Sequence, residues 1–299
     1  MTYSVVARDP ETGELGGAVQ SHWFSVGTSV LWGEAGVGMV ATQSMIERAY
    51  GPHGLSRMAS GMAPADALAE LTAADEGSAW RQVGLVDAKG RVATHTGSSC
   101  VDAAGHMAGD GWSIQANMME HDTVWPAMAS AFGQGGGLPL AERLLLTLDA
   151  GEAEGGDIRG RQSAALLVVA AQPSAWSWQD RLVDLRVDDH PDPLGELRRL
   201  LVLRRAYDEM SVADSAVEGG QVDDSVERHH RASQLVPDSA EIRFWEAIAL
   251  VNAGRAVEAE PLLASIFGVD DRWRQFLARI ATRGLVDADP ATLDHLGSL

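Results

Sequence analysis

The first 21 residues constrain the fold more than any other stretch, because they encode a β-hairpin that begins at the second residue of the chain. Residues 3–8 form a β-branched run, residues 9–14 form a turn cluster with Pro10 and Gly13, and residues 15–21 read as the return strand. Gly16 and Gly17 would weaken a strand by themselves. They indicate that another element packs closely against the backbone of the second strand.

Strands and helices then follow in blocks along the first two hundred residues. Further strands are expected at 23–31, 37–43, 82–87, 91–96, 112–118, 164–171 and 182–187, and residues 105–111 are rich in glycine. Amphipathic helices are expected at 50–58, 64–74, 124–132, 138–150 and 197–210. The order predicts an α+β fold, in which layered sheets are covered by helices.

The composition changes after residue 210. Residues 211–225 combine glycine and acidic residues with few large apolar side chains, which is typical of a linker or a frayed helix junction. Helical periodicity returns at 226–236, 240–253, 256–267 and 273–282. We therefore divide the chain into a main domain at 1–210, a linker at 211–225 and a helical extension at 226–299.

The net charge excludes some classes of partner. With 23 basic and 42 acidic residues the formal charge is -19, which argues against nucleic acid and anionic membrane surfaces. No window approaches the roughly 18 uninterrupted apolar residues of a membrane helix, and no signal-peptide pattern begins the chain. The single Cys100 excludes an internal disulfide. We expect a cytoplasmic protein that acts on a neutral or cationic small molecule.

Thr2 follows the initiator methionine, and aminopeptidases readily remove methionine before a small second residue. Removal would leave Thr2 with a hydroxyl and a free α-amine on one residue. An α-amine with a pKa of about 7.7–8.0 is substantially neutral near physiological pH and could take the proton from that hydroxyl. The alternative is that Thr2 is simply the first residue of an edge strand.

Four blocks stand in order along the first two thirds of the chain: TYSVVARDPETGELG at 2–16, AGVGMVATQ at 35–43, GRQSAALL at 160–167 and LRVDDHPDP at 185–193. Together they resemble a bacterial family of unknown function, of DUF1028 type, in the N-terminal nucleophile hydrolase superfamily. The resemblance implies a four-layer αββα sandwich, with two antiparallel sheets between two helical layers. It also implies that Thr2 attacks amide or peptide carbonyls through an acyl-enzyme.

The chain departs from better-known members of that superfamily. The proteasome-type branch uses a lysine near its threonine, but the only lysine here is Lys89, which lies in a turn. Gln20 and Ser21 stand where an aspartate is expected near the end of the second strand. Neutral or imidazole groups must therefore activate Thr2. Ser4, on the same face of the strand, is a supporting group.

Strand ends supply further candidates for the site. Ser21 and His22 could flank Thr2, although His22 is equally well a surface or packing imidazole. Gln43 and Ser44 end another strand, where their amide and hydroxyl donors could form an oxyanion pocket or cap the next turn.

Three other candidates lie further along the chain. Asn117 ends a β run and could donate to an oxyanion or serve as a turn residue. Arg161, beside Ser163, could bind a substrate carboxylate bidentately or pair with the preceding acidic loop. His106 and His121 lack the spacing of paired metal ligands. We expect no metal and no cofactor.

The C-terminal helices carry a pattern of small and aromatic residues: PDSAE at 237–241, then Trp245, Ala249, Leu250, Gly254, Arg255, Glu258 and Ala259. The pattern resembles a tetratricopeptide repeat, in which small residues sit at helix crossings and a glycine joins paired antiparallel helices. Because fewer than three repeats seldom stand alone, the resemblance implies a structural or protein-binding extension.

Two hypotheses from different classes follow. The leading one is an N-terminal-threonine amidohydrolase that cleaves a small amide, acylated amino acid or peptide-like compound, with Thr2 as nucleophile. The alternative is a non-catalytic protein that keeps the hydrolase fold and uses its helical tail to bind a protein partner. A homodimer fits either hypothesis.

Overall fold

The computed structural model describes residues 2–299, and the chain divides into two compact units. The first unit ends at Arg198 and contains every strand of the described residues, whereas the second unit, Arg199–Leu299, is helical. The predicted α+β class, with antiparallel sheets and a helical C-terminal region, is confirmed.

A six-stranded antiparallel sheet holds the N-terminal strand in its interior. The strand order is β10-β9-β2-β1-β8-β7. The predicted hairpin forms, with Tyr3 opposite Gln20, while β8 on the other side of β1 places Asn117 opposite Thr2. Thr2 is therefore not part of an edge strand. The strands are β1 Thr2–Arg8, β2 Leu15–Ser21, β7 Gly105–Gly109, β8 Trp112–Asn117, β9 Ser163–Val169 and β10 Arg181–Val187.

A four-stranded antiparallel sheet with the order β3-β4-β5-β6 faces the first sheet. Val6 and Val19 of the six-stranded sheet share one buried cluster with Met39 and Ala41 of the four-stranded sheet. The inner faces of the two sheets therefore form a common core. The strands are β3 Leu31–Glu34, β4 Gly38–Ser44, β5 Arg81–Asp87 and β6 Val92–Thr96.

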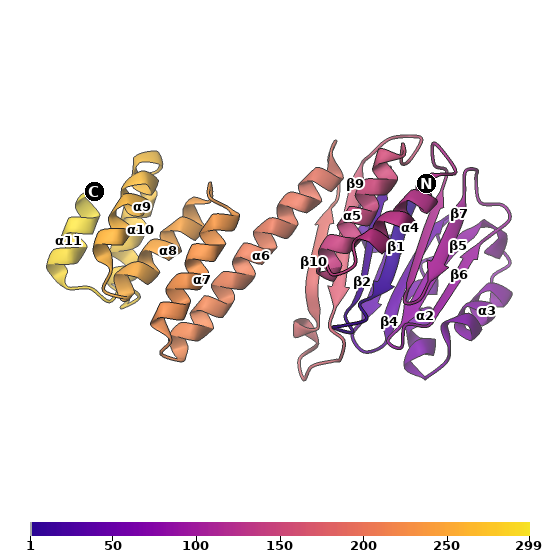
Figure 1. Cartoon of the computed structure of the whole chain (residues 1–299), viewed down its shortest axis with the longest axis horizontal. Helices are drawn as coiled ribbons and strands as arrows, with labels where there is room; N and C mark the ends of the chain where they lie inside the picture. Colours follow the sequence, from indigo (N-terminus) through magenta and orange to yellow (C-terminus); the bar gives the residue numbers. More distant parts are fainter. Residues whose placement is uncertain (1) are drawn as a thin grey trace. The chain divides into compact units, whose positions relative to one another are not determined.

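A pair of helices covers the outer face of each sheet (Figure 1). Helices α4 Val124–Gln134 and α5 Leu140–Ala153 pack on the six-stranded sheet. Helices α2 Tyr50–Ala59 and α3 Pro64–Ala74 pack on the four-stranded sheet, where Leu55 and Leu71 join a buried cluster with Val83 and Leu85. Short 3-10 turns at Ser78–Trp80 and Ser177–Gln179 precede β5 and β10.

Helix α5 explains the glycines of the hairpin. A Cβ atom at Gly16 would lie 2.7 Å from a methyl group of Leu144 and 3.0 Å from a methyl group of Leu140. Only a glycine lets the helix approach the sheet this closely. The close packing predicted for the second strand is confirmed at this position.

The second unit is built from successive helices that pack on their neighbours. Phe244 lies at the centre of an aromatic cluster with Trp245, Trp273 and Phe276. None of the helices within residues 2–299 has both the length and the apolar character needed to cross a bilayer. The helices are α6 Pro193–Glu218, which begins in the first unit, α7 Val222–Leu235, α8 Ala240–Asn252, α9 Ala256–Val269, α10 Arg272–Ala281 and α11 Pro290–Ser298.

One expectation about secondary structure is wrong. Residues 23–31 are not a strand: a turn leads into the short helix α1 Gly27–Val30, in which the amides of Ser29 and Val30 donate to the Val26 carbonyl. The glycine-rich stretch at 105–111, for which no element is expected, contains strand β7. At 211–225, where we expect a linker or a frayed helix junction, α6 continues to Glu218 with Ala213 and Ala216 buried, and α7 begins at Val222.

The contact between α5 and β2 predicts a steric defect. We expect Gly16→Val to lower the free energy of unfolding by about 1–3 kcal/mol, because the branched side chain must displace Leu140 and Leu144. Urea unfolding followed by circular dichroism measures the change. Gly133→Val is the matched control: Gly133 is exposed and has open space around its Cβ position, so its variant should stay within about 0.5 kcal/mol of the wild type. Equal stability of the two variants would contradict the packing argument.

Candidate functional site

Thr2 lies at the point where several strands end side by side. Its hydroxyl oxygen is 3.0 Å from the hydroxyl oxygen of Ser21, the last residue of β2. Gln43 and Ser44, the last residues of β4, come from the facing sheet. Thr2 is only 5% exposed, so the strand end is inside the protein and not on its surface.

A cavity of about 170 Å³ opens beside these residues. Thr2, Ser21, Gln43 and Ser44 line it, which brings together four of the residues singled out from the sequence. The remaining lining residues within the described chain come from the segment after β2 and the segment after β4: Trp23, Val26, Ser29, Val30, Met45 and Ile46. The cavity therefore combines hydroxyl and amide groups at the strand ends with an apolar wall.

A network of buried carboxamides holds the backbone of Thr2. The carbonyl oxygen of Thr2 accepts hydrogen bonds from Gln43 Nε2 at 3.1 Å and Asn117 Nδ2 at 3.3 Å. Both side chains also donate to Gln82 Oε1, at 2.7 and 2.9 Å. Since β5 supplies Gln82 and β4 supplies Gln43, the network joins the four-stranded sheet to Thr2.

Ser4 and Gln115 extend this network along the inner face of the six-stranded sheet. Ser4 Oγ donates to Gln43 Oε1 at 2.6 Å and accepts from Gln115 Nε2 at 2.7 Å. The Ser113 hydroxyl completes the chain by donating to Gln115 Oε1. These side chains are almost completely buried and carry no charge. Burying these polar groups costs little free energy only while their donors are hydrogen-bonded. The paired network then fixes one arrangement of the two sheets.

The network assigns Gln43 and Asn117 a holding role. Each side-chain NH2 group already donates both to the Thr2 carbonyl and to Gln82 Oε1, so neither amide is open toward the cavity. Ser44 differs. Its hydroxyl is buried without a hydrogen-bond partner among residues 2–299, on a residue of the cavity wall. A buried unpaired hydroxyl costs free energy, which a ligand oxygen in the cavity would recover.

Three residues other than glycine adopt a positive φ within the described chain, and all lie near this site. Ser44 has a φ of 72°, Ser25 follows the cavity residue Trp23 by two positions with a φ of 52°, and Met118 follows Asn117 with a φ of 57°. A left-handed backbone at a residue with a side chain costs about 1–3 kcal/mol and is concentrated at functional sites. The backbone strain at these three residues therefore supports a functional role for this part of the structure.

His22, Arg161 and Ser163 make hydrogen bonds and ion pairs with the segments around the cavity. The His22 ring nitrogen Nδ1 lies 3.3 Å from the Arg161 carbonyl oxygen. Arg161 pairs with Glu152 at 3.1 Å and with Asp192 at 3.3 Å, as expected for pairing with the acidic loop. The Ser163 hydroxyl donates to the Trp23 carbonyl and accepts from the Val26 amide, so it braces the segment that lines the cavity.

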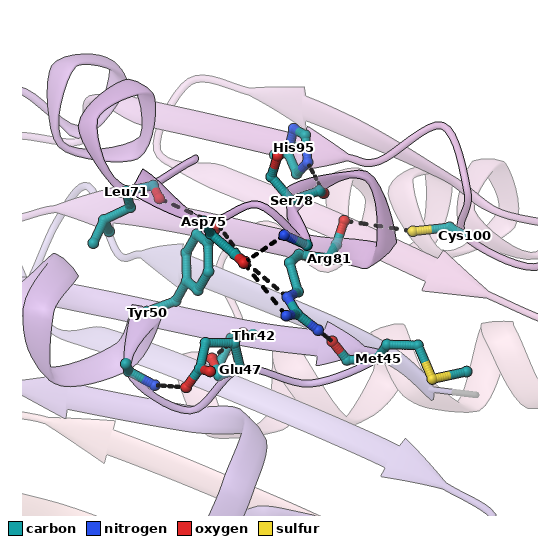
Figure 2. A network of polar contacts seen from close by, with 12 residues as sticks. Thr42, Met45, Glu47, Tyr50, Leu71, Asp75, Ser78, Arg81, His95 and Cys100 are labelled. Atoms are coloured by element: carbon teal, nitrogen blue, oxygen red, sulfur yellow. Dashed lines mark hydrogen bonds and ion pairs between the residues drawn. The ribbon is translucent and has the colours of Figure 1, made fainter. Parts of the chain in front are cut away.

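An ion pair lies next to the cavity residue Met45 and holds its backbone carbonyl (Figure 2). Arg81 donates from Nε to Asp75 at 2.8 Å and from a terminal nitrogen to the Met45 carbonyl at 2.6 Å. Asp75 also accepts from the Tyr50 hydroxyl and the Gly77 amide. The hydrogen bond from Arg81 lowers the pKa of Asp75, while burial and the neighbouring Asp75 raise the pKa of Tyr50. The pair thus fixes the backbone at Met45, between Ser44 and Ile46.

Cys100 and the histidines take no part in the site. The Cys100 thiol is buried and donates to the Arg81 carbonyl, and His106 contacts the Thr96 hydroxyl. Burial lowers the pKa of His106. Over residues 2–299, no three His, Cys, Asp or Glu side chains gather as a metal ion would require.

Comparison with known proteins identifies the chain. Residues 2–197 match the sequence profile of a family described as "Family of unknown function (DUF1028)". The chain belongs to the DUF1028 family. A crystal structure of protein SPO2555 from Silicibacter pomeroyi, which carries the same family name, is similar over 67% of this chain and 87% of that one, with 35% sequence identity and a TM-score of 0.60. No curated protein matches the chain.

The DUF1028 match coincides with one structural unit. It begins at Thr2, the first residue of β1, and ends one residue before the boundary of the first unit at Arg198. The cavity and the carboxamide network therefore belong entirely to the DUF1028 region. The helical second unit lies outside the matched residues.

Sequence reasoning missed Gln82 and Gln115, which connect the network. The available signal is the alternation of polar and apolar residues at 112–117, where Ser113, Gln115 and Asn117 share one strand face. That alternation is usually typical of a face exposed to water. Here the polar face is buried against the polar residues of a second sheet.

The network predicts a large cost for removing one carboxamide. We expect Gln43→Leu to lower the free energy of unfolding by about 2–4 kcal/mol, because the Ser4 hydroxyl and Gln82 Oε1 lose buried partners. Urea unfolding measures the loss. Gln134→Leu removes only an exposed bond to Ser130 and should change stability by less than about 0.5 kcal/mol. A Gln43→Leu protein as stable as this control would contradict a holding role.

The Asp75–Arg81 pair predicts a pH dependence. Because the folded-state pKa of Asp75 is lowered, the pair stabilises the fold above the unfolded-state pKa of about 3.9 and loses this effect as the pH falls through the folded-state value. We expect Asp75→Asn to cost about 2 kcal/mol at pH 7 and much less near pH 2. Thermal unfolding at both pH values tests this, with the exposed Asp122→Asn as control. A cost that does not change with pH would contradict the ion-pair account.

Proposed function

We propose that the protein is an N-terminal-threonine amidohydrolase that cleaves a small amide through an acyl-enzyme. One observation carries the proposal: Thr2 lines a cavity while two carboxamides fix the carbonyl of the same residue. A nucleophile needs this combination of access and a fixed position. The layering of two sheets between helix pairs agrees with a four-layer sandwich of the N-terminal nucleophile hydrolase type.

The proposal requires removal of Met1, which lies outside the described residues. The α-amine of Thr2 would then be the base, because no lysine stands nearby: Lys89 lies in the turn between β5 and β6, where its amide donates to Asp87. An α-amine has an ordinary pKa of about 7.7–8.0. We therefore expect kcat/KM to rise with pH through this range and to level off above it, as the amine loses its proton.

The reaction balances with the groups present. The α-amine takes the proton of the Thr2 hydroxyl while Oγ1 bonds to the amide carbon, and the same proton passes to the nitrogen of the leaving amine as the C–N bond breaks. The resulting ester is hydrolysed by a water that gives its proton to the α-amine. The product acid leaves, and the proton returns to Oγ1.

Neutral side chains assist these steps. Ser21 lies within hydrogen-bond distance of the Thr2 hydroxyl and orients it. Ser44 supplies the hydroxyl that can donate to the developing oxyanion, since its Oγ has no other partner. Gln43, Asn117 and Ser4 contribute by holding Thr2 in position. His22, Arg161 and Ser163 shape the surrounding loops and take no chemical step.

Mass spectrometry and mutation test the proposal together. We expect the intact protein to lack Met1 and to gain one acyl adduct at residue 2 from a β-lactone probe. Thr2→Ala should lose the adduct and lower the hydrolysis of a p-nitroanilide panel by at least about 10³-fold, whereas Thr2→Ser should keep measurable activity. Thr12→Ala, in the exposed turn after β1, is the control and should react as the wild type does. A retained methionine, or full activity of Thr2→Ala, would sink the proposal.

A further inference from the structure

We infer that the cavity beside Thr2 takes the acyl part of the substrate, and that this acyl group is uncharged, apolar and about as large as a benzene ring. The inference rests on the proposed function for its chemistry, but the binding preference follows from the cavity itself. It names the substrate class that the family description leaves open.

The lining excludes charged acyl groups. Among the described residues that form the wall, the polar ones are Thr2, Ser21, Ser29, Gln43 and Ser44, and none of the lining side chains is ionisable. A carboxylate or ammonium group inside would lose its water without gaining an opposite charge from any lining side chain, which costs several kcal/mol. The formal charge of -19 repels anionic substrates further.

The apolar part of the cavity wall indicates that the acyl group is apolar. Val26 and Val30 are almost fully buried, and Ile46 is half-buried. Trp23 and Met45 line the same cavity yet are 58% and 46% exposed. The cavity thus has buried and exposed apolar residues in its wall, against which a hydrocarbon group can lose contact with water.

The volume sets the size of that group. A cavity of about 150 Å³ lined by apolar side chains is large enough to bind benzene. The cavity here measures about 170 Å³, so it suits a phenyl or a branched chain of four to six carbons and is too small for two fused rings. The unpaired Ser44 hydroxyl then provides a donor for the amide oxygen at the polar end.

Binding of simple carboxamides tests the inference without any turnover. The full-length Thr2→Ala protein is titrated by ligand-observed NMR with acetamide, 3-methylbutanamide, benzamide and 2-naphthamide. Succinamate and 4-aminobutanamide serve as the anionic and cationic counterparts. We expect 3-methylbutanamide and benzamide to bind at least about 10-fold more tightly than acetamide, since each added buried carbon strengthens binding. The naphthamide and both charged amides should bind at least 10-fold more weakly than benzamide.

A second variant ties the preference to this cavity. Ile46→Phe, at a half-buried position of the wall, should reduce the affinity for benzamide at least about 10-fold by filling the space and leave acetamide unchanged. Val257→Phe, at a position 77% exposed in the second unit, makes the matched control and should alter neither affinity. Urea unfolding of each variant shows that the fold is kept.

The outcomes separate the two proposals. Benzamide that binds as expected, with no acyl adduct at wild-type Thr2, would refute the hydrolase and leave the ligand class standing. An adduct that forms equally well from charged acyl groups would refute the ligand class and leave the nucleophile standing. Binding without any dependence on size or charge, or no binding of any carboxamide, also overturns the inference.

Discussion

The hydrogen bonds that Gln43 and Asn117 donate to the Thr2 carbonyl are the interaction on which the site depends. The Gln43 bond crosses from the four-stranded sheet to the six-stranded sheet, and the Asn117 bond lies within the six-stranded sheet. Gln82 accepts from both carboxamides, so its position couples β4, β5 and β8. Because these partners are buried, each would be left unpaired if the sheets moved apart. The packing of the two sheets and the position of Thr2 therefore depend on the same buried hydrogen bonds.

The register of β1 extends this constraint along the strand. Thr2, Ser4 and Val6 face the second sheet, whereas Tyr3 faces helix α5, where its hydroxyl donates to Glu152. A shift by one residue would place Tyr3 in the carboxamide network and Thr2 under the helix. Pairing with β2 on one side and β8 on the other makes such a shift costly. The interior position of the strand thus keeps Thr2 on the face that meets the second sheet, where it lines the cavity.

Much of the fold could be predicted because local patterns agree with the tertiary structure. The hairpin follows from its turn residues, and the contact of Gly16 with α5 follows from a glycine in an otherwise regular strand. Thr2, Ser21, Gln43 and Ser44 were found because they stand at strand ends. Gln82 and Gln115 were missed, since polar alternation indicates a solvent face unless a second polar sheet covers it. His22 also follows a strand end, and its ring lies against the Arg161 carbonyl, while Arg161 pairs with Glu152.

The hydrogen-bond network that holds Thr2 contains no charged side chain, and this limits the reactions that the site can support. A lysine or aspartate beside Thr2 would have to be desolvated between the sheets, at a cost that paired carboxamides avoid. Because no side chain that lines the cavity is ionisable, the proposed reaction uses the α-amine of Thr2 as its base. The same exclusion applies to the ligand, because the wall that continues from Gln43 to Ile46 carries no ionisable side chain either. The proposed hydrolysis fits such a site, because it needs only one group that carries a proton and a substrate without charge.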